Sequence, residues 1–496
     1  MKFGSIIIKF VLLTSLVATF FSCKKDKLIT DSSAIVHFSQ DSVLFDTVFT
    51  SIGSSTRNIR VINKNNQKIK ISNIQLQNGS SSQFIVNVDG AKGISFQDIE
   101  IAANDSMYIF IQVNINPGGG LPFIVSDKLI FSVNGNTQSV ALEAWGQDAY
   151  YHRPTDAIKF KDGTYLPYSI IAATPNTTVT WTNDKPHVIY GYLVVDSAQT
   201  LIINAGVRVY FNYKAALWVY RYGCLQVKGQ KGNEVFFQGA RREKDYADEP
   251  GQWDRIWINE GSVDNSIDYA IIKNGYIGVQ VDNFYNDLTF PCRLKITNTK
   301  IQNMSLWGLY ASGFNVYGGN NVISNCQEYS LNILLGGKYT FLHCTFANFW
   351  SKDKAREKPT VNINNYTGLP QVLPLDSCYF GNCIIEGKLA NEINLDLDYT
   401  NMAFQPQLKF SNCWLKTTAS VTNTAVYLND IRTGTSSVAF KDPNKYDFQL
   451  YPGEIKVKNF VNSQATIDAG KFPFDLNGPG SPRNTTSVSI GAYEAN

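Results

Sequence analysis

The sequence predicts an all-β protein: a β-sandwich followed by a right-handed parallel β-helix, which is a solenoid of stacked coils. Two observations predict this fold. From about residue 34 to 147, short runs alternate apolar and polar residues between clusters of turn residues, and no helical period interrupts them. From residue 155 to 496, a short motif recurs at intervals of 22 to 29 residues. A chain of 496 residues has room for both parts, at roughly 100 to 200 residues per domain.

The composition excludes two classes of protein. Hydrophobic residues make up 44% of the chain, close to the ~45% of soluble domains, so the sequence can form a large core and is not disordered. The 44 basic residues nearly balance the 41 acidic residues, so the chain has no large excess of positive charge. Nucleic-acid binding depends on many Lys and Arg side chains that neutralise phosphates and release their counterions, so we expect no nucleic-acid partner.

Residues 1–22 have the features of a signal peptide. An uncharged, mostly apolar run of about a dozen residues ends at Phe21, which fits the ~7 to 15 of a signal peptide rather than the ~20 of a membrane-spanning helix. The Ser22-Cys23 junction that follows resembles a bacterial lipobox. That resemblance implies a lipid on the thiol of Cys23, attachment to a membrane through this lipid, and a tether over residues 23–33. The alternative is soluble secretion, with Cys23 either removed or without a role.

The first part of the chain, residues 34–147, is predicted to be an antiparallel sandwich. Alternating runs at 59–61, 84–86 and 108–113 are separated by Gly, Asn, Asp and Ser residues, as in sandwiches of short strands. The order of its motifs, from Phe45-Asp-Thr to Asn104-Asp-Ser106, resembles the immunoglobulin-like domains related to major sperm protein. This resemblance implies a binding or spacer module rather than a catalytic domain.

The second part contains a repeat of the form apolar-any-Asn. The apolar residues of the repeat are Ile272, Ile301, Ile323 and Phe346, and the series continues, after an insertion, at Ile385 and Leu415. A small or polar residue lies two positions before each, on the same side of a strand, so each pair is expected to face inward and stack on the next. Intervals near 22 residues are too short for a βαβ unit of ~30 or more and suit a coil of three short parallel strands.

The asparagines of the repeat predict a structural ladder at a bend of each coil. Asn274, Asn303, Asn325 and Asn348 occupy the third position of successive repeats. Asn tolerates left-handed backbone, and its side-chain amide can bond from coil to coil. Of the cysteines after Cys23, only Cys378 and Cys383 are close enough in sequence to suggest a disulfide, and the sequence leaves this bridge undecided.

Two longer stretches resemble a known family. The run from Gly251 to Ile258, Gly-Gln-Trp-Asp-Arg-Ile-Trp-Ile, is similar to the opening coils of β-helix lipoproteins from Gram-negative envelopes. The C-terminal motifs Ile467-Asp-Ala-Gly470 and Ile490-Gly-Ala-Tyr-Glu494 resemble the closing region of the choice-of-anchor Q family. These resemblances imply a right-handed parallel β-helix of the pectin-lyase-like type. They also imply a cell-envelope protein anchored by lipid to the outer membrane, on a face that the sequence leaves open.

The C-terminal region, from about 465 to 496, is expected to cap the solenoid. An uncapped solenoid exposes the strand edge of its last coil. Asp468, Asp475 and Arg483 can satisfy the free backbone groups of such an edge through charge-assisted hydrogen bonds. A calcium site built from Asp468, Asp475 and Asn477 is the alternative, because calcium prefers clustered oxygen ligands. Apart from calcium, we expect no cofactor.

The function predicted from these features is glycan or other macromolecular binding without catalysis, by a monomer. The candidate carbohydrate-binding residues are aromatic, because aromatic rings stack on sugars, and they are Tyr210, Tyr213, Trp218, Tyr220, Tyr222, Trp307 and Tyr310. One alternative is a polysaccharide lyase or glycoside hydrolase, although neither the carboxylate cluster with a base nor the carboxylate pair that such enzymes need is clear in the sequence. Asp396 and Asp398 fall on one face of a predicted strand, where an outward polar face is the favoured interpretation. The other is a structural or adhesive stalk. The ligand and any catalytic residues are not identified by the sequence.

Overall fold

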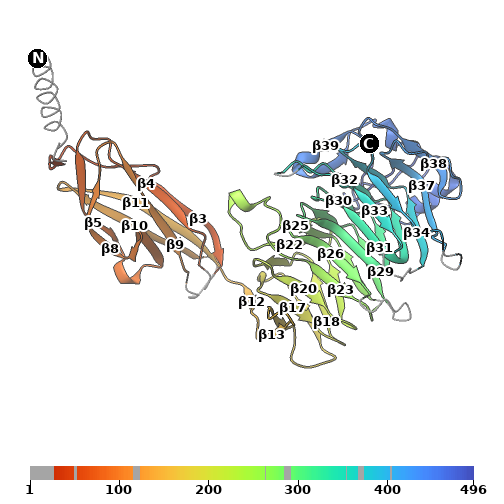
Figure 1. Cartoon of the computed structure of the whole chain (residues 1–496), viewed down its shortest axis with the longest axis horizontal. Helices are drawn as coiled ribbons and strands as arrows, with labels where there is room; N and C mark the ends of the chain where they lie inside the picture. Colours follow the sequence, from red (N-terminus) through yellow and green to blue (C-terminus); the bar gives the residue numbers. More distant parts are fainter. Residues whose placement is uncertain are drawn as a thin grey trace, which may run out of the picture. The chain divides into compact units, whose positions relative to one another are not determined.

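The computed structural model describes residues 27–49, 53–115, 123–262, 264–283, 292–352, 355–366, 374–400, 402 and 405–495. The predicted signal peptide and Cys23 lie outside these residues. The chain divides between Ala149 and Tyr150 into two compact units (Figure 1). The regular secondary structure of both units is almost entirely β-strand, and no helix among the described residues is long and apolar enough to cross a membrane.

The first unit consists of two sheets. One has the strand order β1-β5-β10-β11-β3, with β8 also paired to β5, and the other has the order β2-β4-β9-β6-β7. The strands are β1 (Leu28–Ile29), β2 (His37–Phe38), β3 (Ser42–Phe49), β4 (Arg57–Ile62), β5 (Lys68–Leu76), β6 (Phe84–Val88), β7 (Ala91–Gly93), β8 (Ser95–Ile101), β9 (Ser106–Val113), β10 (Phe123–Val133) and β11 (Asn136–Gln147); a short 3₁₀ helix, η1 (Gly79–Ser81), precedes β6.

The alternation in the sequence places one face of each sheet in a shared core. Ile59 and Val61 of β4 and Ile109 and Ile111 of β9 are all fully buried, while the residues between them are exposed or half-buried. Two strand pairs differ from the antiparallel prediction, because β1 pairs with β5 and β3 pairs with β11 in parallel. These are edge strands, and the free backbone groups of an edge accept a partner in either direction.

The second unit is a long sheet of parallel strands wound into coils, consistent with a β-helix or a related solenoid. Three columns of strands run along it. Column 1 contains β15 (Thr178–Trp181), β18 (Thr200–Asn204), β21 (Cys224–Lys228), β24 (Asn265–Asp268), β27 (Arg293–Thr297), part of β29 (Trp307–Gly319), part of β31 (Leu331–Leu342), β34 (Leu375–Gly381), part of β37 (Leu408–Leu415) and β38 (Tyr427–Thr433).

Columns 2 and 3 complete each coil. Column 2 contains β12 (Tyr150–His152), β16 (His187–Ile189), β19 (Arg208–Phe211), β22 (Val235–Gly239), β25 (Ala270–Lys273), β28 (Lys300–Gln302), β30 (Val322–Ser324), β32 (Thr345–Asn348), β35 (Ile384–Gly387) and the end of β37. Column 3 contains β14 (Tyr165–Ile170), β17 (Tyr192–Val195), β20 (Ala216–Val219), β23 (Ile256–Asn259), β26 (Ile277–Asp282), the first parts of β29 and β31, β33 (Val361–Asn364) and β36 (Ile393–Asp396); β13 (Asp156–Lys159) forms a hairpin with β14.

The predicted rungs are neighbours in space. Ile301 lies in register between Ile272 and Ile323, and Phe346 lies in register between Ile323 and Ile385. All five side chains are fully buried in one core cluster, and Leu415 continues the series beside Ile385. The parallel stacking predicted from the repeat is therefore confirmed.

The asparagine ladder is only partly formed. Asn274, Asn303 and Asn325 have φ of 65°, 61° and 50°, and the amide of Asn303 donates to Oδ1 of Asn274 at 2.7 Å. Asn325 instead donates to the carbonyl of Pro443. The backbone of Asn348 is not left-handed, and its side-chain amide donates to the carbonyls of Cys326 and Glu328. This position differs because the chain leaves the regular coil after it.

A second column of left-handed residues lies at the bend between columns 1 and 2. It contains Asn298, Asn320, His343, Asn382 and Asn412, with φ between 49° and 55°. The sequence prediction missed this column, although four of its five residues are asparagines. The cysteines beside it, Cys344, Cys383 and Cys413, are free and buried, and Cys378 is also free, so no bridge joins Cys378 to Cys383.

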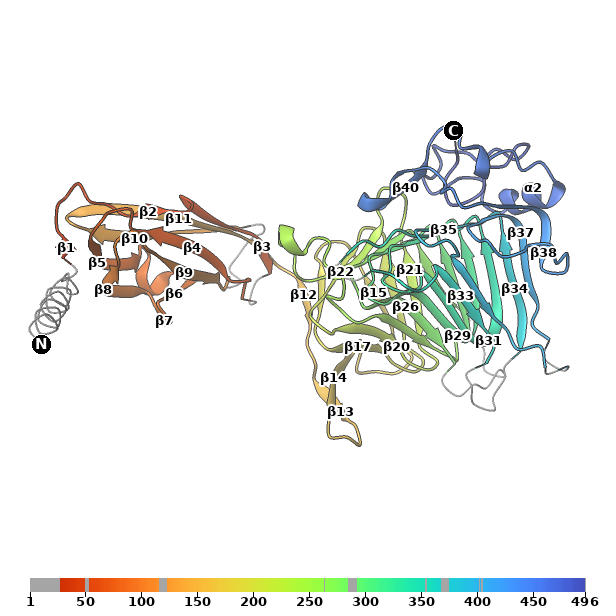
Figure 2. The same ribbon diagram turned by 45° about the horizontal axis from the view of Figure 1, so that its top comes forward.

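The C-terminal segment, residues 438–495, packs along the side of the solenoid rather than over its end (Figure 2). It contains β39 (Phe440–Asp442), η4 (Pro443–Lys445), β40 (Asp447–Leu450), η5 (Ile455–Val457) and α2 (Ser463–Gly470). Its apolar residues form a core with the outward side chains of column 2, which are Val322, Ala347, Ile384 and Trp414. A Cβ at Gly319 would overlap the ring of Phe472, which shows how closely this segment approaches the coils.

Candidate functional site

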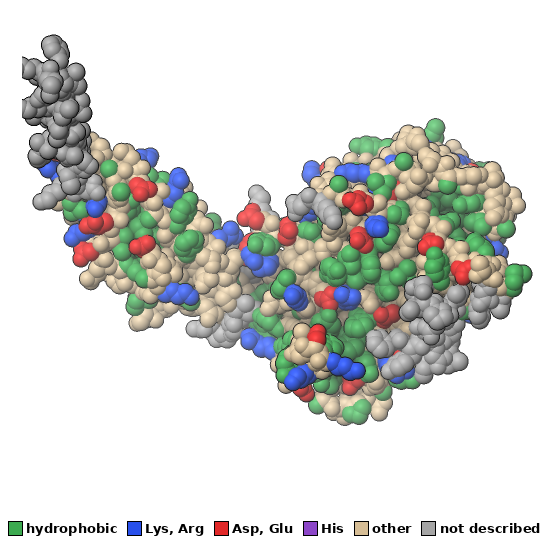
Figure 3. Space-filling model, in the orientation of Figure 1, with side chains coloured by type: hydrophobic (Ala, Val, Ile, Leu, Met, Phe, Trp, Pro, Cys, Tyr) green, Lys and Arg blue, Asp and Glu red, His purple; other side chains and the backbone are tan. Residues whose placement is uncertain are grey.

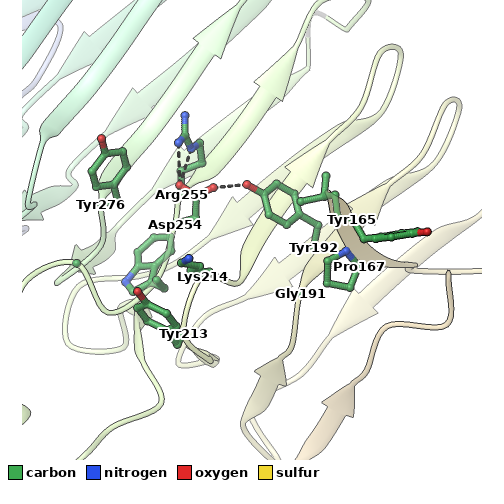
Figure 4. Close-up of a pocket in the computed structure, with 12 residues that line it drawn as sticks. Tyr165, Pro167, Gly191, Tyr192, Tyr213, Lys214, Asp254, Arg255 and Tyr276 are labelled. Carbon is green, nitrogen blue, oxygen red and sulfur yellow. Dashed lines mark hydrogen bonds and ion pairs between the residues drawn. The ribbon is translucent and has the colours of Figure 1, made fainter. Parts of the chain in front are cut away.

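A pocket of about 550 Å³ lies beside column 3 near the beginning of the solenoid (Figure 4). Its size falls within the range of ligand-binding pockets, ~300 to 1,000 Å³. Tyr165, Tyr213 and Tyr276 are its most exposed aromatic residues, at 61%, 70% and 42%. The remaining lining residues are Leu166, Pro167, Gly191, Tyr192, Lys214, Gly251, Trp253, Asp254 and Arg255.

A hydrogen-bonded group of three side chains lies in the wall of this pocket. The hydroxyl of Tyr192 donates to the carboxylate of Asp254, and Arg255 donates to the same carboxylate at 2.8 Å (Figure 4). Burial, followed by the charge of Asp254, raises the pKa of the Tyr192 hydroxyl well above its usual value. Tyr192 is therefore a neutral hydrogen-bonding group, and the charges of Asp254 and Arg255 compensate each other.

The hydrogen-bond network continues from the pocket along column 3. Arg255 donates to the amide oxygen of Gln280, and Gln280 donates to Asp282 at 2.8 Å. Asp282 also accepts from the indole of Trp257 at 2.7 Å and from Asn259 at 2.8 Å. Burial raises the pKa of Asp282, although its three hydrogen-bond donors oppose this shift. The network holds Trp257 in one orientation.

Half-buried aromatic residues form a row beside this network, because parallel register brings equivalent positions of successive coils together. Trp218 is in register with Trp257, and their rings stack 4.9 Å apart at an interplanar angle of 10°. The next positions in register are Gln280 and Tyr310, and Tyr310 stacks on Trp307 at 4.9 Å. We call Trp218, Trp257, Gln280 and Tyr310 the aromatic row; it contains no charged residue.

The structure brings together five of the seven predicted aromatic residues. Trp218 and Tyr310 belong to the aromatic row, Tyr220 and Trp307 contact them, and Tyr213 lines the pocket. Two do not belong to this site. Tyr210 is only 2% exposed and lies on β19 of column 2. Tyr222 lies in the turn between β20 and β21, packed over Gly261.

The residues predicted to cap the last coil instead attach the C-terminal segment to the side of the solenoid. Asp468 accepts from the hydroxyl of Tyr379 at 2.6 Å and pairs with Lys471 at 3.2 Å. Arg483 is paired with Glu494 at 3.1 Å and donates to Asn320 at 2.7 Å. Where the C-terminal segment covers column 2, buried backbone and side-chain polar groups need hydrogen-bond partners. This need explains why Asp468 and Arg483 lie there.

The alternative calcium site is not assembled by these side chains. Asp475 accepts from the backbone N–H groups of Asn477 and Glu494 at 2.7 and 2.9 Å, while Asp468 is bonded to Tyr379 and Lys471. Among the described residues, no three His, Cys, Asp or Glu side chains converge as a metal site. Both carboxylates are used in internal hydrogen bonds.

Sequence reasoning missed Trp257, Gln280 and the polar group of the pocket. Trp257 lies between Ile256 and Ile258, so alternation alone places its ring on the outer face of β23. Its contact with Trp218 could not be predicted because an irregular insertion between β22 and β23 hides the coil length. Asp254 and Arg255 are adjacent and lie within the run from Gly251 to Ile258, but Tyr192 comes from an earlier coil, so the sequence did not indicate that the three side chains meet.

The site provides aromatic faces, uncharged hydrogen-bonding groups, the paired charges of Asp254 and Arg255, and the exposed cation of Lys214, which lies over the ring of Tyr213. The only carboxylate that lines the pocket, Asp254, is bonded to both Tyr192 and Arg255, so the described residues present no pair of free carboxylates there. On the face shown in Figure 3, acidic and basic side chains are interspersed with hydrophobic ones. Such a surface can hold a polar, uncharged ligand by stacking and hydrogen bonding.

Comparisons with known proteins do not identify a family. No protein-family model and no curated protein matches the chain. Solved structures with partial similarity include a PapD-like domain of human CEP192, at 12% identity over 26% of this chain and 96% of that domain. A family 123 glycoside hydrolase from Clostridium perfringens matches at 10% identity over 29% of this chain and 26% of the hydrolase. The E. coli chaperone DraB matches at 9% identity over 28% of this chain and 82% of the chaperone. All three TM-scores are 0.17.

Proposed function

We propose that this protein is a lipid-anchored envelope protein whose solenoid binds a glycan chain without cleaving it. The observation that carries the proposal is the pocket lined by exposed Tyr165, Tyr213 and Tyr276, linked through Arg255 and Gln280 to the aromatic row. Sugar rings present apolar faces and hydroxyl edges, so a site that combines aromatic faces with fixed amide and carboxylate groups matches both.

The ligand proposed for this site is an uncharged glycan. Arg255 is paired with Asp254, the aromatic row has no charged member, and the remaining charged residue of the described pocket lining, Lys214, lies over the ring of Tyr213. Extended ligands match this arrangement because the positions of the row repeat once per coil, at the ~4.8 Å spacing of parallel strands. Binding without cleavage is favoured because Asp254, the one carboxylate among the described residues that line the pocket, is already engaged by two donors.

The rest of the chain is proposed to place this site at a membrane. The resemblances in the sequence support a lipid at Cys23, an outer-membrane location, an immunoglobulin-like first unit that acts as a binding or spacer module, and a right-handed β-helix related to the choice-of-anchor Q family. We propose that the protein acts as a monomer and needs no cofactor.

The proposal is tested with protein that starts at residue 24 and a panel of polysaccharides. Retention is measured by affinity electrophoresis in gels that contain xylan, galactomannan, β-glucan, alginate or polygalacturonate. Release of reducing ends and of unsaturated products is measured in parallel. The variant is Trp257→Ala, and the matched control is Tyr451→Ala, which removes a 50% exposed ring from the C-terminal segment.

The expected result is retardation by at least one neutral polysaccharide, loss of this retardation in Trp257→Ala, and no effect of Tyr451→Ala. Product release by the unaltered protein would overturn binding without cleavage and favour the hydrolase or lyase alternative. Absence of both retention and products across the panel would contradict the proposal and favour a structural stalk.

A further inference from the structure

The outer face of the sheet β2-β4-β9-β6-β7 carries an exposed aromatic pair. Tyr108 and Phe110 lie two residues apart on β9, are 52% and 45% exposed, and have ring centroids 6.4 Å apart at an interplanar angle of 24°. The other aromatic side chains that the structure describes in this unit are buried or half-buried. Exposing an aromatic ring to water is unfavourable, because the ring has a large apolar surface. A pair of exposed rings on one face of a sheet therefore indicates a contact surface.

Hydrogen-bonding side chains surround this pair. Strand register places Asn58 and Asn87 on either side of Phe110, and Gln112 beside Ile85. Gln112 is held by a hydrogen bond to Thr56 at 2.6 Å. A depression of about 230 Å³ lies here, lined by Thr56, Ile85, Asn87, Lys92, Phe110 and Gln112.

The charged residues in these strand rows are basic. Arg60 is in register with Tyr108, and Lys92 is in register with Asn87, next to Phe110. Both are exposed, and neither forms an ion pair with any residue that the structure describes. The positions opposite Phe110 are uncharged, and Arg60 lies opposite Tyr108; the nearest acidic residue in sequence to these positions, Asp89, is exposed in the turn that follows β6. The aromatic pair therefore lies between two basic side chains that pair with no described residue. Such a surface complements a ligand with apolar faces and regularly spaced anionic groups.

We propose that this face of the first unit is a second glycan-binding site, and that it takes acidic polysaccharide, whose repeating carboxylates pair with Arg60 and Lys92 while sugar rings stack on Tyr108 and Phe110. This site lies in a different unit from the solenoid pocket and takes an anionic rather than an uncharged ligand. It therefore does not depend on the function proposed for the solenoid.

The test is titration of the chain from residue 24 with hexagalacturonate and, as the neutral probe, with cellohexaose. The variants are Phe110→Ala and the double variant Arg60→Ala with Lys92→Ala. The control is Leu44→Ala, which removes a 52% exposed apolar side chain from the opposite sheet. Phe110→Tyr and Arg60→Lys are included, because they keep the surface chemistry and confirm that substitution at these positions is tolerated.

We expect Phe110→Ala and the double variant each to weaken hexagalacturonate binding by roughly tenfold, in line with the loss of an interface anchor. Raising the salt concentration should weaken binding by the unaltered protein and have little effect on the residual binding of the double variant. Leu44→Ala and Trp257→Ala should leave hexagalacturonate binding unchanged.

Three results would overturn this inference. The first is equal hexagalacturonate affinity in Phe110→Ala, the double variant and the unaltered protein. The second is loss of hexagalacturonate binding in Trp257→Ala, which would assign the acidic ligand to the solenoid. The third is a concentration-dependent dimer, seen by sedimentation, that Phe110→Ala dissociates, because this face would then bind a second copy.

Discussion

Two flanks of the solenoid share the same coil geometry but differ in what their outward residues contact. On the column-2 flank, outward Val322, Ile384 and Trp414 are buried under the C-terminal segment. On the column-3 flank, Trp218, Trp257 and Tyr310 remain half-exposed beside a pocket. The comparison shows that inward residues specify the solenoid, whereas outward residues decide whether a flank is closed by the chain itself or available to a ligand.

The ion pairs of the two flanks differ in the same way. Arg483 and Glu494 on the covered flank have side-chain exposures of 0% and 2%. Arg255 and Asp254 on the open flank are 22% and 15% exposed. Both members of the first pair belong to the C-terminal segment and are shielded from solvent, whereas the second pair lies on the solenoid and is partly exposed at the pocket.

The largest expected effect is on the covered flank. Arg483→Ala leaves Glu494 buried without its partner, and breaking a buried pair costs about 3 to 5 kcal/mol. We expect this loss in the free energy of unfolding measured with urea. Lys445→Ala removes a cation that is 84% exposed and should change stability by less than about 0.5 kcal/mol. Equal stability of the two variants would show that the segment is not fastened through Arg483.

The covered flank was only partly predictable from sequence. The sequence allowed one set of core residues to be aligned, because the apolar-any-Asn pattern recurs at nearly constant intervals. These residues are Ile272, Ile301, Ile323 and Phe346. The position of the C-terminal segment could not, because its contacts are long-range and its polar residues, such as Arg483, bond to side chains more than a hundred residues away. A closing motif indicates that a solenoid is covered, but not on which side.

A second prediction concerns the histidines at the beginning of the solenoid. His187 stacks on Trp181 at 3.9 Å, and its Nδ1 lies 3.0 Å from Nε2 of His152. Burial lowers the pKa of His152 to about 4 and that of His187 to about 3. Both are neutral when folded, so stability is full above the unfolded pKa near 6.5 and falls as pH decreases towards 4.

At pH 5 this loss should reach ~2 kcal/mol for each histidine, relative to pH 7. His187→Phe keeps an aromatic ring against Trp181 but cannot bind a proton, so its unfolding free energy should fall less between pH 7 and pH 5. Urea denaturation at both pH values measures the difference. An identical fall in the variant and the unaltered protein would contradict the role of His187.

A third prediction concerns the open flank. Tyr310→Ala removes one ring of the aromatic row, and we expect it to weaken binding of a neutral hexasaccharide by roughly tenfold, or ~1.4 kcal/mol. Tyr310→Phe retains the ring and should bind almost as well as the unaltered protein. Calorimetric titration measures both. An unchanged affinity in Tyr310→Ala would exclude this position from the site.

The candidate site was predicted in its residue types but not in its assembly. Tyr213, Trp218 and Tyr310 were identified because aromatic rings stack on sugars and such residues are clustered in these stretches of sequence. Tyr210 was assigned to the same group by proximity in sequence, but it lies on another column and is buried. Coil geometry separates residues that are close in sequence and joins others, such as Trp218 and Trp257, that are far apart.

The smallest effect is expected at the bend between columns 2 and 3. Asn303 has a φ of 61°, which disfavours residues with a Cβ other than Asn and Asp. Asn303→Ala and Asn303→Gly both lose the hydrogen bond to Asn274, but only alanine adds left-handed strain. We expect Asn303→Gly to be about 1 kcal/mol more stable than Asn303→Ala in thermal or urea unfolding. The reverse order would mean that packing, not backbone strain, limits this bend.

Hydroxyl-radical footprinting of the tryptophans, with and without a neutral glycan, tests the central claim most directly. If the open flank is the binding site, the glycan will reduce oxidation of Trp218, Trp257 and Trp307 and leave Trp145 of the first unit unchanged. Unaltered oxidation of Trp218 and Trp257 by a glycan that the protein demonstrably binds would place the site elsewhere and contradict the account.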